Sequence, residues 1–141
     1  MLQKKDFGND SVSSLLIASV RTADVNSTGI DLKEHDGVLF IVSLGNSADT
    51  LSGSVYIELE VETSDDNSAW VDAADADLSA SVTGTNTGTF AKIDAPGEDS
   101  TVFTVAYLGR ERYARVVVNV TGTHSTGTPV AVCAIRTRAK Y

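Results

Sequence analysis

Residues 102–138 read VFTVAYLGRERYARVVVNVTGTHSTGTPVAVCAIRTR and contain three runs rich in β-branched and aromatic residues. The first two runs meet at Gly109-Arg110-Glu111, and the third follows the link TGTHSTGTP. Short β-rich runs separated by turn residues predict consecutive antiparallel strands, here a three-stranded meander. The middle run, VVVNV at 116–120, has apolar residues on both sides of the pleat, which predicts a strand covered on much of both faces.

Two earlier segments carry the next clearest strand patterns. In residues 54–63 (SVYIELEVET), apolar side chains alternate with a tyrosine and three glutamates, Glu58, Glu60 and Glu62. This period of two predicts a half-buried antiparallel strand with a wet, acidic outer face. Residues 38–44 (VLFIVSL) lack polar alternation and predict a strand buried on both faces.

Further strands are expected near residues 14–20, 27–32, 79–83 and 87–93, and no stretch predicts an amphipathic helix of three turns. Roughly eight short strands with turn residues between them predict an all-β fold, an antiparallel β-sandwich or a jelly-roll-like barrel. A length of 141 residues is typical of one domain. We expect residues 1–12 to form an N-terminal arm and 13–141 a single β-sandwich domain. The polar segment 73–101 is expected to be a long contact loop with one or two weak strands.

Composition narrows the classes of partner. The chain has 19 acidic and 11 basic residues, a formal charge of −8, which argues against nucleic acid because phosphate binding needs clustered Lys and Arg. Most basic residues lie near the C-terminal end, whereas the middle of the chain is acidic. These regions either dock copies of the chain or a mixed-charge scaffold, or are solvated separately. No segment has the length of a membrane span, so we expect a soluble protein made in a cytoplasm without a membrane partner.

The sequence predicts no enzyme, no cofactor and no metal site. His35 and His124 lie in turn-like segments, and there is no Gly-x-Ser-x-Gly elbow. The single cysteine, Cys133, lies in the apolar run VAVCAI and is expected to be a buried small residue. Asp65-Asp66-Asn67 resembles part of a calcium loop but lacks the EF-hand spacing, so either a solvated turn or a weak hard-cation site remains open. No feature selects a pair of catalytic carboxylates.

Two segments resemble small virion proteins of tailed bacteriophages: IELEVETSDDNSAWVDA at 57–73 and YLGRERYARVVVNVTGTHSTGTPVAVCAI at 107–135. They look most like head decoration, or capsid cement, proteins. The resemblance implies a β-rich structural protein that is made in the host cytoplasm and binds the outside of a phage head. It implies the major capsid protein as partner and a homo-oligomer, with a trimer preferred because head junctions commonly have threefold symmetry. It implies no catalytic residue.

The candidate interface residues are the aromatic residue of the arm, the single tryptophan and the C-terminal arginines: Phe7, Trp70, Arg110, Arg112, Arg115, Arg136 and Arg138. The last two, with Lys140, suggest docking on an acidic capsid surface. Arg110, Arg112 and Arg115 are also expected to pair with the acidic strand at 54–63, within or between subunits. Two alternatives stay open. One is a tail-tube or head-completion subunit. The other is a carbohydrate-binding module that uses exposed Trp70, Tyr56 and Tyr113.

Overall fold

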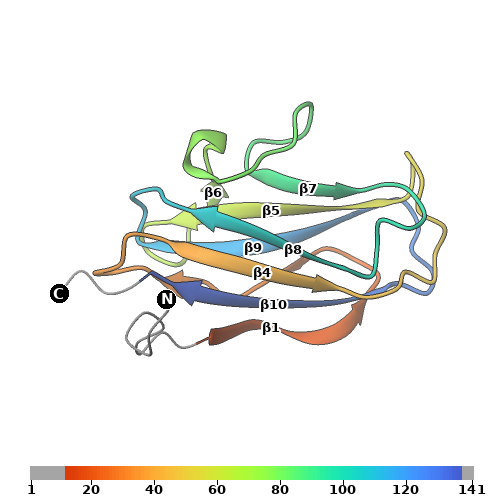
Figure 1. Cartoon of the computed structure of the whole chain (residues 1–141), viewed down its shortest axis with the longest axis horizontal. Coiled ribbons are helices and arrows are strands. Elements are labelled where there is room, and N and C mark those ends of the chain that lie inside the picture. Colours follow the sequence, from red (N-terminus) through yellow and green to blue (C-terminus); the bar gives the residue numbers. More distant parts are fainter. Residues whose placement is uncertain (1–11, 138–141) are drawn as a thin grey trace, which may run out of the picture.

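The computed structural model describes residues 12–137, which form two antiparallel sheets packed face to face (Figure 1). The strands are β1 (Val12–Arg21), β2 (Val25–Asn26), β3 (Ile30–Asp31), β4 (Val38–Leu44), β5 (Tyr56–Ser64), β6 (Val71–Asp72), β7 (Thr89–Ile93), β8 (Thr101–Tyr107), β9 (Tyr113–Thr121) and β10 (Thr128–Arg136). The one helical element in this range is the short 3₁₀ turn η1 (Asp75–Asp77). The predicted antiparallel β-sandwich is confirmed.

The first sheet, sheet A, has the order β1-β10-β4-β8. The second, sheet B, has the order β2-β9-β5-β6, with β3 also paired to β9 and β7 also paired to β5. Every pairing in both sheets is antiparallel. The N-terminal strand β1 therefore pairs with the C-terminal strand β10, and Figure 1 shows these two strands side by side at the lower edge.

The predicted C-terminal meander is wrong, although its three strands exist. β8 and β10 belong to sheet A, whereas β9 belongs to sheet B, so both connecting links cross from one sheet to the other. The strand patterns do not distinguish these arrangements, because a strand shows the same alternation whether its neighbour in sequence is hydrogen-bonded to it or faces it across the core. Val105 of β8 and Val116 of β9 both lie in this core, and each is at most 1% exposed.

Both sheets contribute to one hydrophobic core. Its largest fully buried side chains are Tyr107, Phe40, Ile57, Leu59 and Ile93. Burying an aliphatic or phenylalanine side chain stabilises a fold by roughly 1.5–3 kcal/mol, so the alternating inward positions of the long strands supply most of the driving force. The expected arm, residues 1–12, lies outside the described residues except for Val12, which belongs to β1.

Two predictions about strand faces are corrected by the structure. β4 is buried on one face only, because Leu39 and Ser43 are exposed. The acidic face of β5 is not wet: Glu60 is only 4% exposed. The reason is position, since β5 is central in sheet B and the side chains of β9, β6 and β7 cover its outer face. The middle of β9 is covered on both faces as predicted, because Val117 is also buried.

Of the one or two weak strands expected in the 73–101 segment, one forms. β7 matches the expected strand at 87–93, but no strand forms over 79–83. Residues 77–79 instead run along the outer edge of β8. Ser79 donates a backbone hydrogen bond to the Ala106 carbonyl at 3.0 Å, and the Leu108 N–H donates to the Asp77 carbonyl at 2.9 Å. This segment covers the edge of β8, which would otherwise present unpaired backbone groups.

Candidate functional site: three surfaces of the sandwich

Three of the predicted interface arginines are placed near one end of the sandwich, beside β3 and the β8–β9 loop (108–112). Arg112 donates two hydrogen bonds to the carboxylate oxygens of Asp31, at 3.2 and 3.0 Å. The Arg136 guanidinium donates to the Asp31 carbonyl at 3.1 Å. The hydrogen bond from Arg112 lowers the pKa of Asp31. Arg110 is exposed and makes no hydrogen bond or ion pair within the described range 12–137.

The β8–β9 loop separates two open hollows. One, of about 600 Å³, lies between this loop and residues 32–36, and the other, of about 400 Å³, lies on its opposite side next to β6 and η1. Their walls carry charges of both signs, including Lys33, Glu34, Arg110 and Glu111. In the second hollow a hydrogen bond with Asp65 raises the pKa of Glu111. Because acidic and basic side chains line both hollows, neither hollow favours an anionic over a cationic ligand.

Neither histidine lies in an arrangement that suggests catalysis. The His35 Nδ1 atom is 2.6 Å from the Thr137 carbonyl oxygen, so its ring helps to hold the 34–37 turn against the end of β10. His124 is 5% exposed, and its Nε2 atom is 2.9 Å from the Thr121 carbonyl oxygen. Both rings therefore support loops, in agreement with their sequence-based assignment as turn residues.

The second surface is the outer face of sheet B, where Arg115 and Trp70 meet. Glu62 and Arg115 are direct cross-strand partners, and Arg115 Nε donates to a Glu62 carboxylate oxygen at 2.7 Å. The Arg115 guanidinium lies 4.3 Å from the centre of the Trp70 ring. The predicted pairing of an arginine with the acidic strand is thus confirmed for Arg115 within one chain, whereas Arg112 pairs with Asp31 in β3 instead.

The three aromatic residues considered for sugar binding are half-buried rather than exposed. A cation of the same chain covers one face of each ring: Arg115 over Trp70, Lys92 over Tyr56 at 4.4 Å, and Arg112 over Tyr113 at 5.0 Å. Sugar stacking needs an open aromatic face, and these cation–π contacts already use one face of each ring. No observation on this surface favours the carbohydrate alternative.

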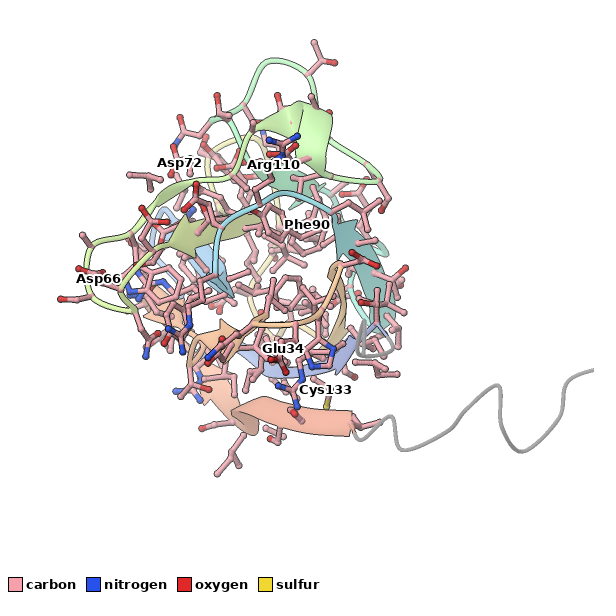
Figure 2. The ribbon with its side chains drawn as sticks, turned by 90° about the vertical axis from the view of Figure 1, so that its left-hand side faces the viewer. Glu34, Asp66, Asp72, Phe90, Arg110 and Cys133 are labelled. Carbon is pink, nitrogen blue, oxygen red and sulfur yellow. The ribbon has the colours of Figure 1, made fainter. Side chains whose placement is uncertain are left out.

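A compact acidic group lies next to Arg115 on the same face. Carboxylate oxygens of Glu60, Glu62 and Asp72 lie within 4.8 Å of one another. Asn119 donates a hydrogen bond to Glu60 at 2.6 Å. Burial, followed by the hydrogen bond and charge of Asp72, raises the pKa of Glu60 to about 7. Figure 2 shows Asp72, like Asp66, on the outer side of sheet B.

The third surface is the outer face of sheet A, and sequence reasoning missed it. On β4, β8 and β10 most inward positions are buried, and the alternate positions face outward with no charged side chain among them. The outward residues are Leu39, Ile41, Ser43, Val102, Thr104, Ala106, Pro129, Ala131, Cys133 and Ile135. On β1, exposed Val12, Ser14 and Val20 lie opposite the outward residues of β10 and extend this surface, which we call the uncharged face.

Cys133 is part of the uncharged face and is not buried as predicted. It is half-exposed, whereas its neighbours Val132 and Ala134 are 0% exposed. Figure 2 shows its sulfur on the side of β10 away from the sandwich interior. A sequence signal existed, because residues 39, 41, 43 and 131, 133, 135 are uncharged at a period of two. This pattern predicts a shared uncharged face only if β4 and β10 are known to be neighbours in the sheet.

The remaining candidate residues, Phe7 and Arg138, lie outside the described residues. None of the helical structure in residues 12–137 has the length and apolar character needed to cross a membrane. Comparison with protein-family profiles and with curated protein sequences gives no match.

Proposed function

We propose that this chain is a structural subunit of a tailed-bacteriophage particle, a decoration or cement protein that binds the outer surface of the head. The observation that carries the proposal is the uncharged face of sheet A. A chain with a formal charge of −8 keeps the outward positions of four adjacent strands free of charge. An uncharged and largely apolar surface of this kind is typical of a protein–protein contact.

The two sheets have distinct roles in this proposal. The uncharged face lies against the shell, formed by the major capsid protein, and the charged outer face of sheet B is directed toward solvent. A rigid sandwich with one docking face suits a protein that is present in many copies, because repeated weak contacts on a symmetric shell add through multivalency. A homotrimer at the threefold junctions of the head is the preferred assembly.

The C-terminal arginines are proposed to contribute less to capsid docking than the sequence suggested. Arg112 pairs with the Asp31 carboxylate and Arg136 donates to the Asp31 carbonyl, so both guanidinium groups are held by the same chain. Arg110, at the tip of the β8–β9 loop, is the arginine of this group with an unused guanidinium among residues 12–137. Docking is therefore proposed to depend mainly on apolar contact.

A matched pair of valines tests this docking face. Val102 in β8 is 58% exposed on the uncharged face, and Val71 in β6 is 64% exposed on sheet B. We expect Val102→Glu to weaken co-sedimentation with heads lacking the protein by about tenfold or more, because a charge buried against the shell has no partner. Val71→Glu should bind like the wild type. Equal binding of both variants contradicts docking through the uncharged face.

Electron microscopy of particles carrying labelled protein tests the class of function itself. Label distributed over the head at regular sites is the expected result. Label on the tail or at the head–tail junction would replace the proposal with a tail-tube or head-completion role. Absence of any attachment to heads or tails would remove the virion assignment.

A further inference from the structure

The acidic group on sheet B has the geometry of a cation site. Glu60 and Glu62 are two residues apart on β5 and point to the same side of the sheet, and Asp72 of β6 is the direct cross-strand partner of Glu62. The three carboxylates therefore converge from two neighbouring strands, with oxygens within 4.8 Å of one another. Glu60 is 4% exposed and Asp72 is exposed, so the group is open to solvent on the side of Asp72.

The charges within this group are not balanced by the protein. Arg115 pairs with Glu62, and Asn119 donates a neutral hydrogen bond to Glu60. The nearby cation Lys92 pairs with Asp94 and lies over the Tyr56 ring. Three carboxylates and one guanidinium leave two negative charges when all are ionised. Like charges this close repel one another, and a divalent cation would balance them.

A second, independent observation points to the same place. Thr89 of β7 is 1% exposed, and its hydroxyl oxygen has no hydrogen-bond partner. It is the cross-strand partner of Glu60, just beyond an irregularity in the β5–β7 register, so the two side chains lie on the same side of the sheet. A buried hydroxyl without a partner is uncommon, and a neutral oxygen donor beside carboxylates is a common part of a hard-cation site.

We propose that Glu60, Glu62 and Asp72, with the Thr89 hydroxyl beside them, bind a hard divalent cation, with calcium as the preferred ion. Calcium takes oxygen ligands at about 2.3–2.6 Å, so oxygens on opposite sides of the ion are about 4.6–5.2 Å apart, in keeping with the spacing of the carboxylates. Magnesium demands a near-ideal octahedron at about 2.0–2.1 Å, whereas calcium accepts irregular sets of oxygen ligands, so calcium suits carboxylates from two strands better. The ion would tie β6 and β7 to opposite halves of the same edge of β5.

The Asp65-Asp66-Asn67 turn is the competing location for a bound cation, but the carboxylate of Asp66 already accepts hydrogen bonds within the turn. One Asp66 carboxylate oxygen accepts hydrogen bonds from the Ser68 and Ala69 N–H groups, each at 2.9 Å, and from the Ser64 hydroxyl at 3.0 Å. That oxygen stabilises the turn and is poorly placed to bind an ion. Asp65→Asn is therefore a control for cation binding at the turn.

Terbium luminescence provides a direct assay, because Tb³⁺ replaces calcium and is excited by a nearby tryptophan. The chain has a single tryptophan, Trp70, which stacks on the arginine that binds Glu62. We expect tryptophan-sensitised terbium emission that calcium suppresses by competition. Asp72→Asn and Thr89→Val should each weaken terbium affinity, the former by about tenfold or more, the scale on which single groups act at metal sites.

Two matched control variants show whether cation binding is specific to this acidic group. Glu58→Gln removes a carboxylate from the same face of β5 outside the group, and Asp65→Asn removes one from the turn; neither should change the emission. The proposal is overturned if Asp65→Asn loses emission to the same extent as Asp72→Asn, or if Asp72→Asn binds terbium with unchanged affinity. It is also overturned if calcium up to about 10 mM, a concentration above the dissociation constants of weak extracellular sites, does not raise the melting temperature. These measurements use the isolated protein, so their outcome is independent of whether the chain binds a phage head.

Discussion

Gly109 passes over the hydroxyl end of Tyr107, a side chain that is 1% exposed at the end of β8. A Cβ atom at Gly109 would overlap the ring and hydroxyl of Tyr107, which has no room to move in the core. The same hydroxyl accepts a hydrogen bond from the Glu111 N–H at 3.2 Å, so it also fixes the loop that carries Arg110. The absence of a side chain at Gly109 is therefore a packing requirement of the β8–β9 loop.

Gly109→Ala should lower the free energy of unfolding by about 1–3 kcal/mol, the usual cost of forcing extra atoms into a packed site. Urea denaturation followed by Trp70 fluorescence measures the change. Gly53→Ala is the control, because a Cβ there meets no atom within 4 Å, and its effect should stay within about 0.5 kcal/mol. Equal stability of the two variants would show that the loop can shift away from Tyr107 at little cost.

An ion pair between two residues could be predicted only where the sequence clearly indicates both of the strands that carry them. The sequence placed arginines after 109 beside the glutamates of β5, and Glu62–Arg115 follows because the two residues face each other in the register. Arg112 was assigned to the same acidic strand but binds Asp31. Asp31 lies in a two-residue strand whose pairing with β9 leaves no clear periodic signal in the sequence.

At the scale of elements, alternation predicted the long strands but not the sheet to which each belongs. β5 and β9 have the expected inward residues, and the register between them is continuous from Tyr56–Thr121 to Ser64–Tyr113. The meander failed because choosing between a hairpin and a link across the core depends on long-range pairing. The uncharged face was missed for the same reason, since it exists only when β1, β10, β4 and β8 lie side by side.

The alternation of β10 can be tested with thiol chemistry. Cys133 is the single cysteine of the chain and is half-exposed, whereas Val132 is 0% exposed. A maleimide should label native wild-type protein at least about tenfold faster than the double variant Val132→Cys, Cys133→Ser, because labelling a buried thiol requires local opening. In denaturant the two rates should become equal. Slow labelling of Cys133 in the native protein would contradict its outward position on β10.

At the scale of the whole molecule, three arginines of the basic C-terminal part, Arg112, Arg115 and Arg136, bind groups of the same chain. Arg115 neutralises Glu62 on sheet B, and Arg112 neutralises Asp31 at the loop end. The two faces also differ in kind: sheet B presents charged side chains and aromatic rings, and sheet A presents no charge at its outward positions. This difference between faces is the property on which the proposed orientation on a shell depends.

Asp49 connects the β4–β5 and β9–β10 links, each of which runs from one sheet to the other. Its carboxylate accepts hydrogen bonds from the Gly127 N–H at 2.6 Å and the Thr126 N–H at 3.1 Å. The Gly127 hydrogen bond is the main reason that the pKa of Asp49 is lowered. Because the folded state lowers this pKa, the unfolded chain binds the proton more readily, and the stabilisation is present above the unfolded pKa of about 3.9 and is lost as the pH falls further.

Asp49→Asn should therefore lower the melting temperature at neutral pH, because the amide offers only one acceptor oxygen to two N–H groups. The difference from wild type should persist down to about pH 5 and shrink as the pH falls below about 4, because the unfolded wild-type chain then binds a proton at Asp49 more readily than the folded chain does. Thermal denaturation at a series of pH values measures the difference. A difference that stays constant down to pH 3 would show that the contribution of Asp49 does not depend on its charge.

The pairing of β1 and β4 with β10 has a consequence for biosynthesis. β4 ends at Leu44, but the strand that joins it to β1 is completed only at Arg136, 92 residues later in the chain (136 − 44). At about 5–20 residues per second, translation leaves one hydrogen-bonding edge of β4 without that partner for roughly 5–20 seconds. Sheet A closes only when almost the whole chain has emerged, so the nascent chain depends on protection from aggregation until translation is nearly complete.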